Sequence, residues 1–65
     1  MTIQELYKEG IFRLKQARIA EAELDAWYLL EYVTGISRTM YYLKQAEPAE
    51  EHAAESYFDC ISRRA

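Results

Sequence analysis

Residues 21–35, EAELDAWYLLEYVTG, decide the fold. Their apolar residues recur at helical spacing, which predicts a helix from about Glu21 to Thr34. One face of this helix has the pattern of a core stripe: Ala22, Ala26, Leu29, Leu30 and Val33. The opposite side carries Leu24, Trp27 and Tyr28. Because a helix that is apolar on two sides is usually covered on both, we predict that residues 21–34 form the central helix of a bundle. Gly35 then supplies the left-handed residue that ends the helix.

A first helix is predicted ahead of this segment. Thr2 and Glu5 have the spacing of a capping box, which opens a helix. Its apolar stripe contains the following residues: Ile3, Leu6, Tyr7, Gly10, Ile11, Leu14 and Ala17. A glycine inside that stripe costs about 1 kcal/mol of helix propensity relative to alanine. We therefore expect another helix to approach closely at Gly10.

Two more helices are predicted after Gly35. Ser37 is a suitable N-cap for a short helix over residues 38–44, with Met40 and Leu43 as its anchors. Tyr41 and Tyr42 are adjacent, so they cannot both point inward. Pro48 fits the first position of a fourth helix, whose apolar stripe follows from its spacing: Ala54, Tyr57, Phe58 and Ile61. The sequence thus predicts a single all-α domain over residues 1–65, a small bundle of four helices with connections of about two to four residues.

Size and charge exclude several classes of function. A chain of 65 residues buries only about 60% of the surface that its unfolded form exposes, which does not suffice for a catalytic cleft with its own walls. Eight basic and eleven acidic residues give a net charge of −3, which argues against a nucleic-acid interface. The sequence has no signal-peptide pattern and no membrane-spanning stretch, so we expect a cytoplasmic protein without a membrane partner.

The residues that usually carry chemistry are sparse. Cys60 is the single cysteine, which excludes an internal disulfide and a cysteine-based zinc cage. The single histidine, His52, lies one turn into an acidic helix, where a solvated side chain is expected. Neither a phosphate-binding glycine loop nor a nucleophile elbow occurs. We expect no catalytic, cofactor-binding or metal-binding residue in this chain, which should not catalyse a reaction alone.

The aromatic content is high for so small a chain, with six tyrosines, two phenylalanines and one tryptophan. A core of this size cannot enclose all of them, and aromatic residues at the surface are favoured in protein interfaces. The candidate partner surface comprises Phe12, Trp27, Tyr28, Tyr41 and Tyr42. The alternative is that Trp27 and Tyr28 pack beneath the third and fourth helices.

A second group of residues has a predicted structural role: Asp25, Gly35, Ser37 and Arg38. Asp25 lies at the edge of the core stripe, where an unpaired carboxylate would be costly. We expect it to accept hydrogen bonds from Arg38, or from the backbone near Ser37, and so to join the second and third helices. A catalytic role for Asp25 has little support, because no partner acid, base or metal ligand accompanies it.

The segment LDAWYLLEYVTGISR, Leu24 to Arg38, resembles the Asp-Ala-x-x-Leu-Leu … Gly-x-x-Arg signature of a known family. It occurs in the N-terminal helical domain of bacterial release-factor glutamine methyltransferases, the protein-(glutamine-N5) methyltransferases. The resemblance continues to Arg63 and Arg64, where that family also carries an arginine pair, and so covers nearly the whole chain. One departure is Ala17-Arg18, where many relatives have Ala-Gly, which leaves the conformation of this joint open.

The resemblance implies a helical domain that helps to bind and orient a peptide-chain release factor. In the family, a separate C-terminal Rossmann-like domain transfers a methyl group from S-adenosylmethionine to the glutamine of a Gly-Gly-Gln motif. The cofactor-binding glycines and the Asn-Pro-Pro-Tyr motif of that domain do not occur here, so no catalytic residue can be assigned. The sequence ends directly after the arginine pair, and we therefore expect it to be one domain of a longer protein.

Two other functions fit a small acidic helical chain. The domain could serve only to stabilise or orient a methyltransferase domain, which would then cover Phe12, Trp27 and Tyr41. An acyl carrier protein would need a serine at a helix start for its phosphopantetheine arm, and Ser37 is the one serine so placed. However, Ile36 and Arg38 flank it, whereas carriers usually have Asp-Ser-Leu.

Overall fold

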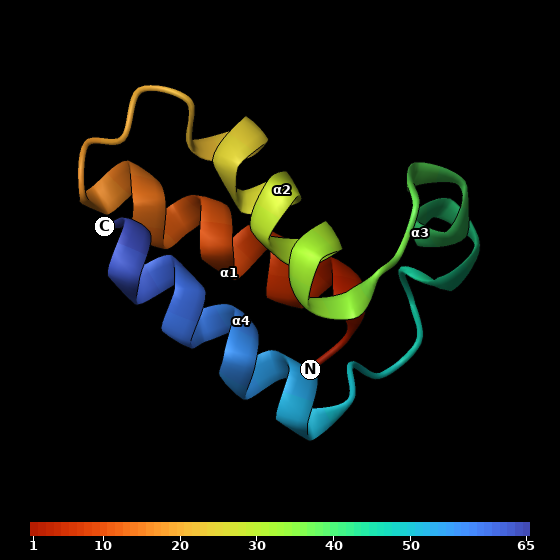
Figure 1. The fold of residues 1–65 in the computed structure, drawn as a ribbon. Coiled ribbons are helices and arrows are strands. Elements are labelled where there is room, and N and C mark those ends of the chain that lie inside the picture. Colours follow the sequence, from red (N-terminus) through yellow and green to blue (C-terminus); the bar gives the residue numbers. More distant parts are fainter.

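Three helices pack against one another and a fourth lies to one side in the computed structural model, which describes residues 1–65. The helices are α1 (Ile3–Gln16), α2 (Ala22–Thr34), α3 (Arg38–Lys44) and α4 (Glu51–Arg64). Figure 1 shows α2 running antiparallel to both α1 and α4, with the short α3 beside the carboxyl end of α2. The all-α prediction is confirmed. However, α2 is one of three mutually packed helices rather than the single central one.

The core comprises eight side chains from α1, α2 and α4: Leu6, Leu14, Ala22, Ala26, Trp27, Leu30, Tyr57 and Ile61. Trp27 is covered, as expected for a helix with two apolar sides. Leu24 and Tyr28 are exposed, so the prediction that α2 is covered along its second side is wrong for these two residues.

The ends of the first two helices follow the sequence signals. Thr2 and Glu5 form the predicted capping box, with Thr2 N donating to Glu5 Oε1 at 2.7 Å and Glu5 N donating to Thr2 Oγ1 at 3.1 Å. The hydrogen bonds that the Glu5 carboxylate accepts from the Thr2 backbone and side chain hold its pKa below the usual value. Gly35 takes the left-handed conformation, φ 70°, and ends α2 as predicted.

The joint after α1 adopts a Schellman motif around Arg18. Arg18 has φ 62°, the left-handed conformation that glycine usually supplies. Ile19 N donates to Leu14 O and Arg18 N donates to Lys15 O, both at 3.0 Å, which are the two hydrogen bonds of this motif. The chain therefore makes the same turn with arginine that an Ala-Gly pair would make at lower conformational cost.

The connection between α3 and α4, residues 45–50, is hydrogen-bonded to the start of α1. Ala49 N donates to Met1 O at 2.8 Å, and the first helical N–H groups, Ile3 N and Gln4 N, donate to Glu47 O and Gln45 O at 3.0 and 2.9 Å. This pairing, which includes a bridge between Thr2 and Pro48, satisfies backbone donors that a helix start leaves free.

That pairing also corrects the predicted start of the fourth helix. Pro48 lies in the extended connection, and α4 begins three residues later behind Glu50. The Glu50 carboxylate accepts from His52 N at 3.0 Å and Ala53 N at 2.9 Å, and these bonds lower its pKa. Residues 17–21 and 45–50 make the first and third connections longer than the expected two to four residues.

Candidate docking surface

An aromatic cluster joins three helices. Tyr7 of α1, Trp27 of α2 and Tyr41 of α3 contact one another edge-to-face, with ring centroids 5.5–5.8 Å apart in all three pairs. The Tyr7 hydroxyl also donates to Glu23 O at 3.2 Å. Burial raises the pKa of both Tyr7 and Tyr41. Trp27 is only 4% exposed, so it holds the fold together and is removed from the predicted partner surface.

Arg38 completes this cluster from outside. Its guanidinium carbon lies 4.3 Å from the centroid of the Trp27 ring, in the geometry of a cation–π contact. Arg38 therefore does not pair with Asp25, and the predicted Asp25–Arg38 link between α2 and α3 is wrong. Two residues apart on a helix, Asp25 and Trp27 point to different flanks, so a side chain stacked on Trp27 cannot also reach Asp25.

Asp25 pairs instead with the end of α4. Its Oδ2 accepts from Arg64 Nη2 at 2.9 Å and from Arg64 Nε at 3.1 Å. This charged contact joins the start of α2 to the last turn of α4. Asp25 thus has a structural role, as expected, but with a different partner and between a different pair of helices.

The remaining predicted structural residue, Ser37, caps α3. Its Oγ accepts from Met40 N at 3.2 Å, which confirms the expected N-cap. The predicted anchors of α3 are wrong, because Met40 and Leu43 are 38% and 74% exposed. Tyr41 faces the bundle and holds α3 in place through the aromatic cluster, while Tyr42 points outward.

The outer side of α2 exposes a continuous apolar stripe, which we call the outer α2 stripe: Leu24, Tyr28 and Tyr32. These residues are 40%, 57% and 81% exposed. Their spacing of four residues places them one above another along the helix. Tyr32 did not belong to the predicted surface, although its spacing from Tyr28 is the signal that could have found it. Large exposed apolar residues in a row mark contact sites more often than single ones.

The other predicted surface residues fall into separate places. Tyr42 is 71% exposed on α3, next to Leu43. Phe12 is 56% exposed on α1 and borders a shallow hollow whose other lining residues come from the N-terminus and α1: Met1, Glu5, Lys8 and Glu9. The five predicted residues therefore do not form one surface. Tyr28 and Tyr42 are exposed on α2 and α3, and Trp27 and Tyr41 belong to the aromatic cluster. Phe12 is exposed on α1, away from the other four.

No group of three or more His, Cys, Asp or Glu side chains is placed to hold a metal ion. Cys60 is half-buried and His52 is exposed. No helix has the length and apolar character needed to cross a membrane.

Comparison with known proteins gives two consistent matches. A family model described as the PrmC N-terminal domain matches residues 5–65. A release factor glutamine methyltransferase of Deinococcus radiodurans is 35% identical over 65 residues, which are 100% of this chain and 23% of the relative. The chain thus spans less than a quarter of the length of that relative. No solved structure matches the chain significantly.

Proposed function

The chain belongs to the PrmC N-terminal domain family, and from this membership we propose that it is the docking domain of a release-factor glutamine methyltransferase. It binds the peptide-chain release factor, in the cytoplasm where translation terminates. A C-terminal domain of the parent protein then transfers the methyl group from S-adenosylmethionine to a glutamine side chain. The domain itself contributes no catalytic residue and binds no cofactor.

The outer α2 stripe is the observation that carries this proposal. In a chain with nine buried residues, α2 leaves two tyrosines and a leucine open along one side. Tyrosine suits protein interfaces because it supplies a large, rigid contact area together with a polar hydroxyl. The stripe is held in place from behind by the core residues of the same helix, so little conformational entropy is lost when a partner binds there.

The mechanism is positional. Contact with the stripe holds the release factor so that its glutamine reaches the methyltransferase domain. Because the two reactants are then already bound in the right orientation, the methyl transfer proceeds as an effectively unimolecular step. The domain acts on the reaction through the effective concentration and orientation of the substrate protein. We expect its loss to raise KM for the release factor more than it lowers kcat.

Titration of the isotope-labelled chain with the release factor tests the proposal. We expect the amide signals of Leu24, Tyr28 and Tyr32 to shift, and Tyr28→Ala to weaken binding about tenfold, as for a central aromatic contact. Phe12→Ala is the matched control, because Phe12 is equally exposed but lies on α1. Absence of any shift at millimolar concentration would exclude a role in binding the release factor.

A purely structural role is the second candidate, and the exposure of Phe12 favours it. This side chain is 56% exposed and lies apart from the outer α2 stripe, and Met1 is the one other apolar residue that lines its hollow. The methyltransferase domain of the parent protein would cover it. Comparing the solvent protection of Phe12 and Tyr28 in this chain and in the full-length protein separates the two roles.

A further inference from the structure

The outer side of α2 carries unpaired negative charge. Residues 21–35 contain four carboxylates and neither lysine nor arginine. Two of these carboxylates, Glu23 and Asp25, are paired with basic residues of α1 and α4. The other two, Glu21 and Glu31, are exposed and form no ion pair.

Both unpaired carboxylates lie on the same side of the helix as the outer α2 stripe. Glu21 is three residues from Leu24, which is the spacing of neighbours on a helix surface. Glu31 has the same spacing from Tyr28. Leu24 and Tyr28 therefore lie between the two carboxylates, and the exposed face combines an apolar centre with a negative charge at each end.

Glu31 lies where a helix disfavours a negative charge. The carboxyl end of a helix carries partial negative charge and is stabilised by lysine or arginine in its last turn. The last turns of α1, α3 and α4 contain such residues, whereas the last turn of α2 contains none and carries Glu31 instead. Glu31 thus does not stabilise its own helix, and a cation from a partner would be favoured beside it.

The basic residues of the neighbouring helices do not pair with Glu31. Arg38 of α3 is stacked on Trp27 and forms no ion pair. Arg63 of α4 lines a hollow together with Tyr32, and its guanidinium is held in an ion pair within α4. The charge of Glu31 is therefore available to a partner.

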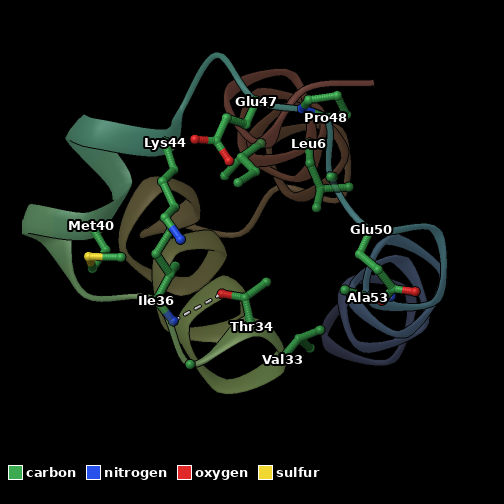
Figure 2. A pocket seen from close by; sticks show the side chains of 13 residues that line it. Leu6, Val33, Thr34, Ile36, Met40, Lys44, Glu47, Pro48, Glu50 and Ala53 are labelled. Atoms are coloured by element: carbon green, nitrogen blue, oxygen red, sulfur yellow. Dashed lines mark hydrogen bonds between the residues drawn. The ribbon is translucent and has the colours of Figure 1, made fainter.

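The end of α2 that carries Glu31 is fixed before any partner binds. Thr34 Oγ1 donates to Leu30 O at 2.7 Å and accepts from Ile36 N at 3.2 Å, and Figure 2 shows the second of these bonds. An added Cβ at Gly35 would meet no atom, so the space beside this residue is open. A preformed and accessible site binds with a smaller loss of conformational entropy.

A groove of about 510 Å³ at the same end of the bundle shows no comparable preference for charge. The charged residues that line it, Lys44, Glu47 and Glu50, have both signs. The Glu50 carboxylate is already bound to the backbone of α4 as its N-cap. The outer side of α2 is therefore the apolar surface on which the charge is one-sided.

We propose that the outer α2 stripe binds a segment of the release factor in which a lysine or arginine lies next to an apolar side chain. The basic side chain pairs with Glu31 and lies against the ring of Tyr28, while the apolar side chain contacts Leu24. A carboxylate and the face of an aromatic ring both attract a cation, so these two neighbours act on the same group. Complementary charge of this kind fixes the register of the partner on the helix. The inference rests on the proposed function, because it states which chemistry of the release factor the stripe recognises.

Neutralising two glutamates one at a time tests the proposal, with the release factor as the probe. Glu31→Gln removes the carboxylate at the stripe, and Glu55→Gln makes the same change of net charge at an exposed, unpaired glutamate of α4. We expect Glu31→Gln to weaken binding about fivefold and to reduce its salt dependence, and Glu55→Gln to weaken it less than about twofold. Because Glu31→Gln removes a negative charge from the carboxyl end of α2, urea unfolding should show equal or higher stability, which separates lost binding from lost folding.

Two substitutions of Tyr28 test the aromatic part of the contact. Tyr28→Leu keeps an apolar side chain but lacks the ring face, so it should weaken binding about threefold. Tyr28→Phe keeps the ring and should weaken binding less than Tyr28→Leu. The reverse order would mean that no cation lies on the ring.

Other outcomes would also overturn the proposal. Equal weakening by Glu31→Gln and Glu55→Gln would show that only net charge matters. Unchanged binding in Glu31→Gln together with weaker binding in Tyr28→Ala would leave the proposed function standing without this charged contact. A Tyr28 side chain that is covered in the full-length protein without release factor would assign the stripe to the parent chain itself. Failure of the unmodified chain to bind the release factor would overturn the proposed function as well.

Discussion

Tyr57 of α4 lies directly against Gly10 of α1 and occupies the space that a side chain at position 10 would need. A Cβ placed on Gly10 would lie 2.6 Å from Cζ and 2.9 Å from Cε2 of the Tyr57 ring. The Tyr57 hydroxyl also donates to Ala26 O of α2 at 3.4 Å. One fully buried side chain therefore contacts the other two core helices, and the glycine in the α1 stripe is explained by the predicted close approach.

Replacing Gly10 by alanine should destabilise the protein. Overpacking costs about 1–3 kcal/mol, and three atoms of the Tyr57 side chain would lie within 3 Å of the new Cβ. The cost should therefore lie in the upper part of that range and exceed the gain of about 1 kcal/mol in helix propensity. Urea unfolding of Gly10→Ala measures the difference. Gly35→Ala is a useful comparison, because an added Cβ at position 35 meets no atom but the backbone has φ 70°. We expect this variant to lose about 1 kcal/mol of stability through backbone strain alone. A Gly10→Ala protein as stable as the unmodified one would contradict the observed packing.

Stability should fall at alkaline pH because of the buried tyrosine. Burial raises the pKa of Tyr57, with smaller contributions from Tyr7 and Tyr41, whereas the unfolded chain ionises at about pH 10. A raised pKa in the folded state means that its stabilising contribution is complete below about pH 10 and is lost as the pH rises further. Urea unfolding between pH 8 and pH 11 should show this decline. The decline should be shallower in Tyr57→Phe, and an unchanged slope would exclude Tyr57 as the cause.

Arg18→Gly should stabilise the protein. Arg18 holds the left-handed conformation at the end of α1, which costs a non-glycine residue about 1 kcal/mol or more. Glycine takes the same conformation without that cost, so the free energy of unfolding should rise by up to about 1 kcal/mol. Ala20→Gly is the control, since Ala20 is also exposed and does not have a positive φ. That variant should be neutral or less stable, and a parallel gain in both variants would point away from backbone strain.

The ion pair between Asp25 and Arg64 should make a measurable contribution to stability. Asp25 is the least exposed charged member of the four ion pairs, with 21% of its side chain exposed, and it accepts two hydrogen bonds from one guanidinium. A double-mutant cycle of Asp25→Asn and Arg64→Ala should give a coupling of about 0.5–1 kcal/mol, in the upper range for partly exposed pairs. The cycle of Asp25→Asn with Arg38→Ala should give a coupling near zero. The reverse order of the two couplings would restore the link between Asp25 and Arg38.

The core-facing sides of α1, α2 and α4 could be predicted because helical spacing determines which side chains form a core. The capping box at Thr2, the N-cap at Ser37 and the left-handed Gly35 could also be predicted, since each depends on residues close in sequence. In contrast, the partner of Asp25 lies 39 residues away on another helix, and no local pattern identifies it. The orientation of α3 depends on ring edges that Tyr7 and Trp27 offer, and these exist only once α1 and α2 have packed.

The start of α4 illustrates a competition that the sequence does not reveal. Proline is favoured at the first position of a helix, which is why Pro48 was expected there. However, the free N–H groups of α1 bind the carbonyl groups of residues 45 and 47 and hold the connection extended. The helix then starts behind Glu50, a residue type that is not among the common N-caps. The same pairing positions Glu47 and Pro48, which line a groove at this end of the bundle, so that groove could not be predicted either.

The stacking of Arg38 on Trp27 leads to a prediction with a direct optical readout. Trp27 is the single tryptophan, so the tryptophan fluorescence of the protein reports on the surroundings of this one ring. Arg38→Ala removes the guanidinium that covers the ring from 4.3 Å and should expose one face of the indole to water. We expect a red-shifted emission in the native state and a loss of about 0.5–1 kcal/mol of stability, the usual size of an exposed cation–π contact. Arg38→Lys should shift the emission less than Arg38→Ala, because the lysine stem still covers part of the ring. Some shift should remain, because the ammonium lacks the planar surface that stacks on the ring. Thr39→Ala, at the next residue of α3 and also exposed, should leave the emission unchanged. An emission spectrum that does not change in Arg38→Ala would mean that Tyr7 and Tyr41 alone shield the indole, and that Arg38 adds nothing to the aromatic cluster.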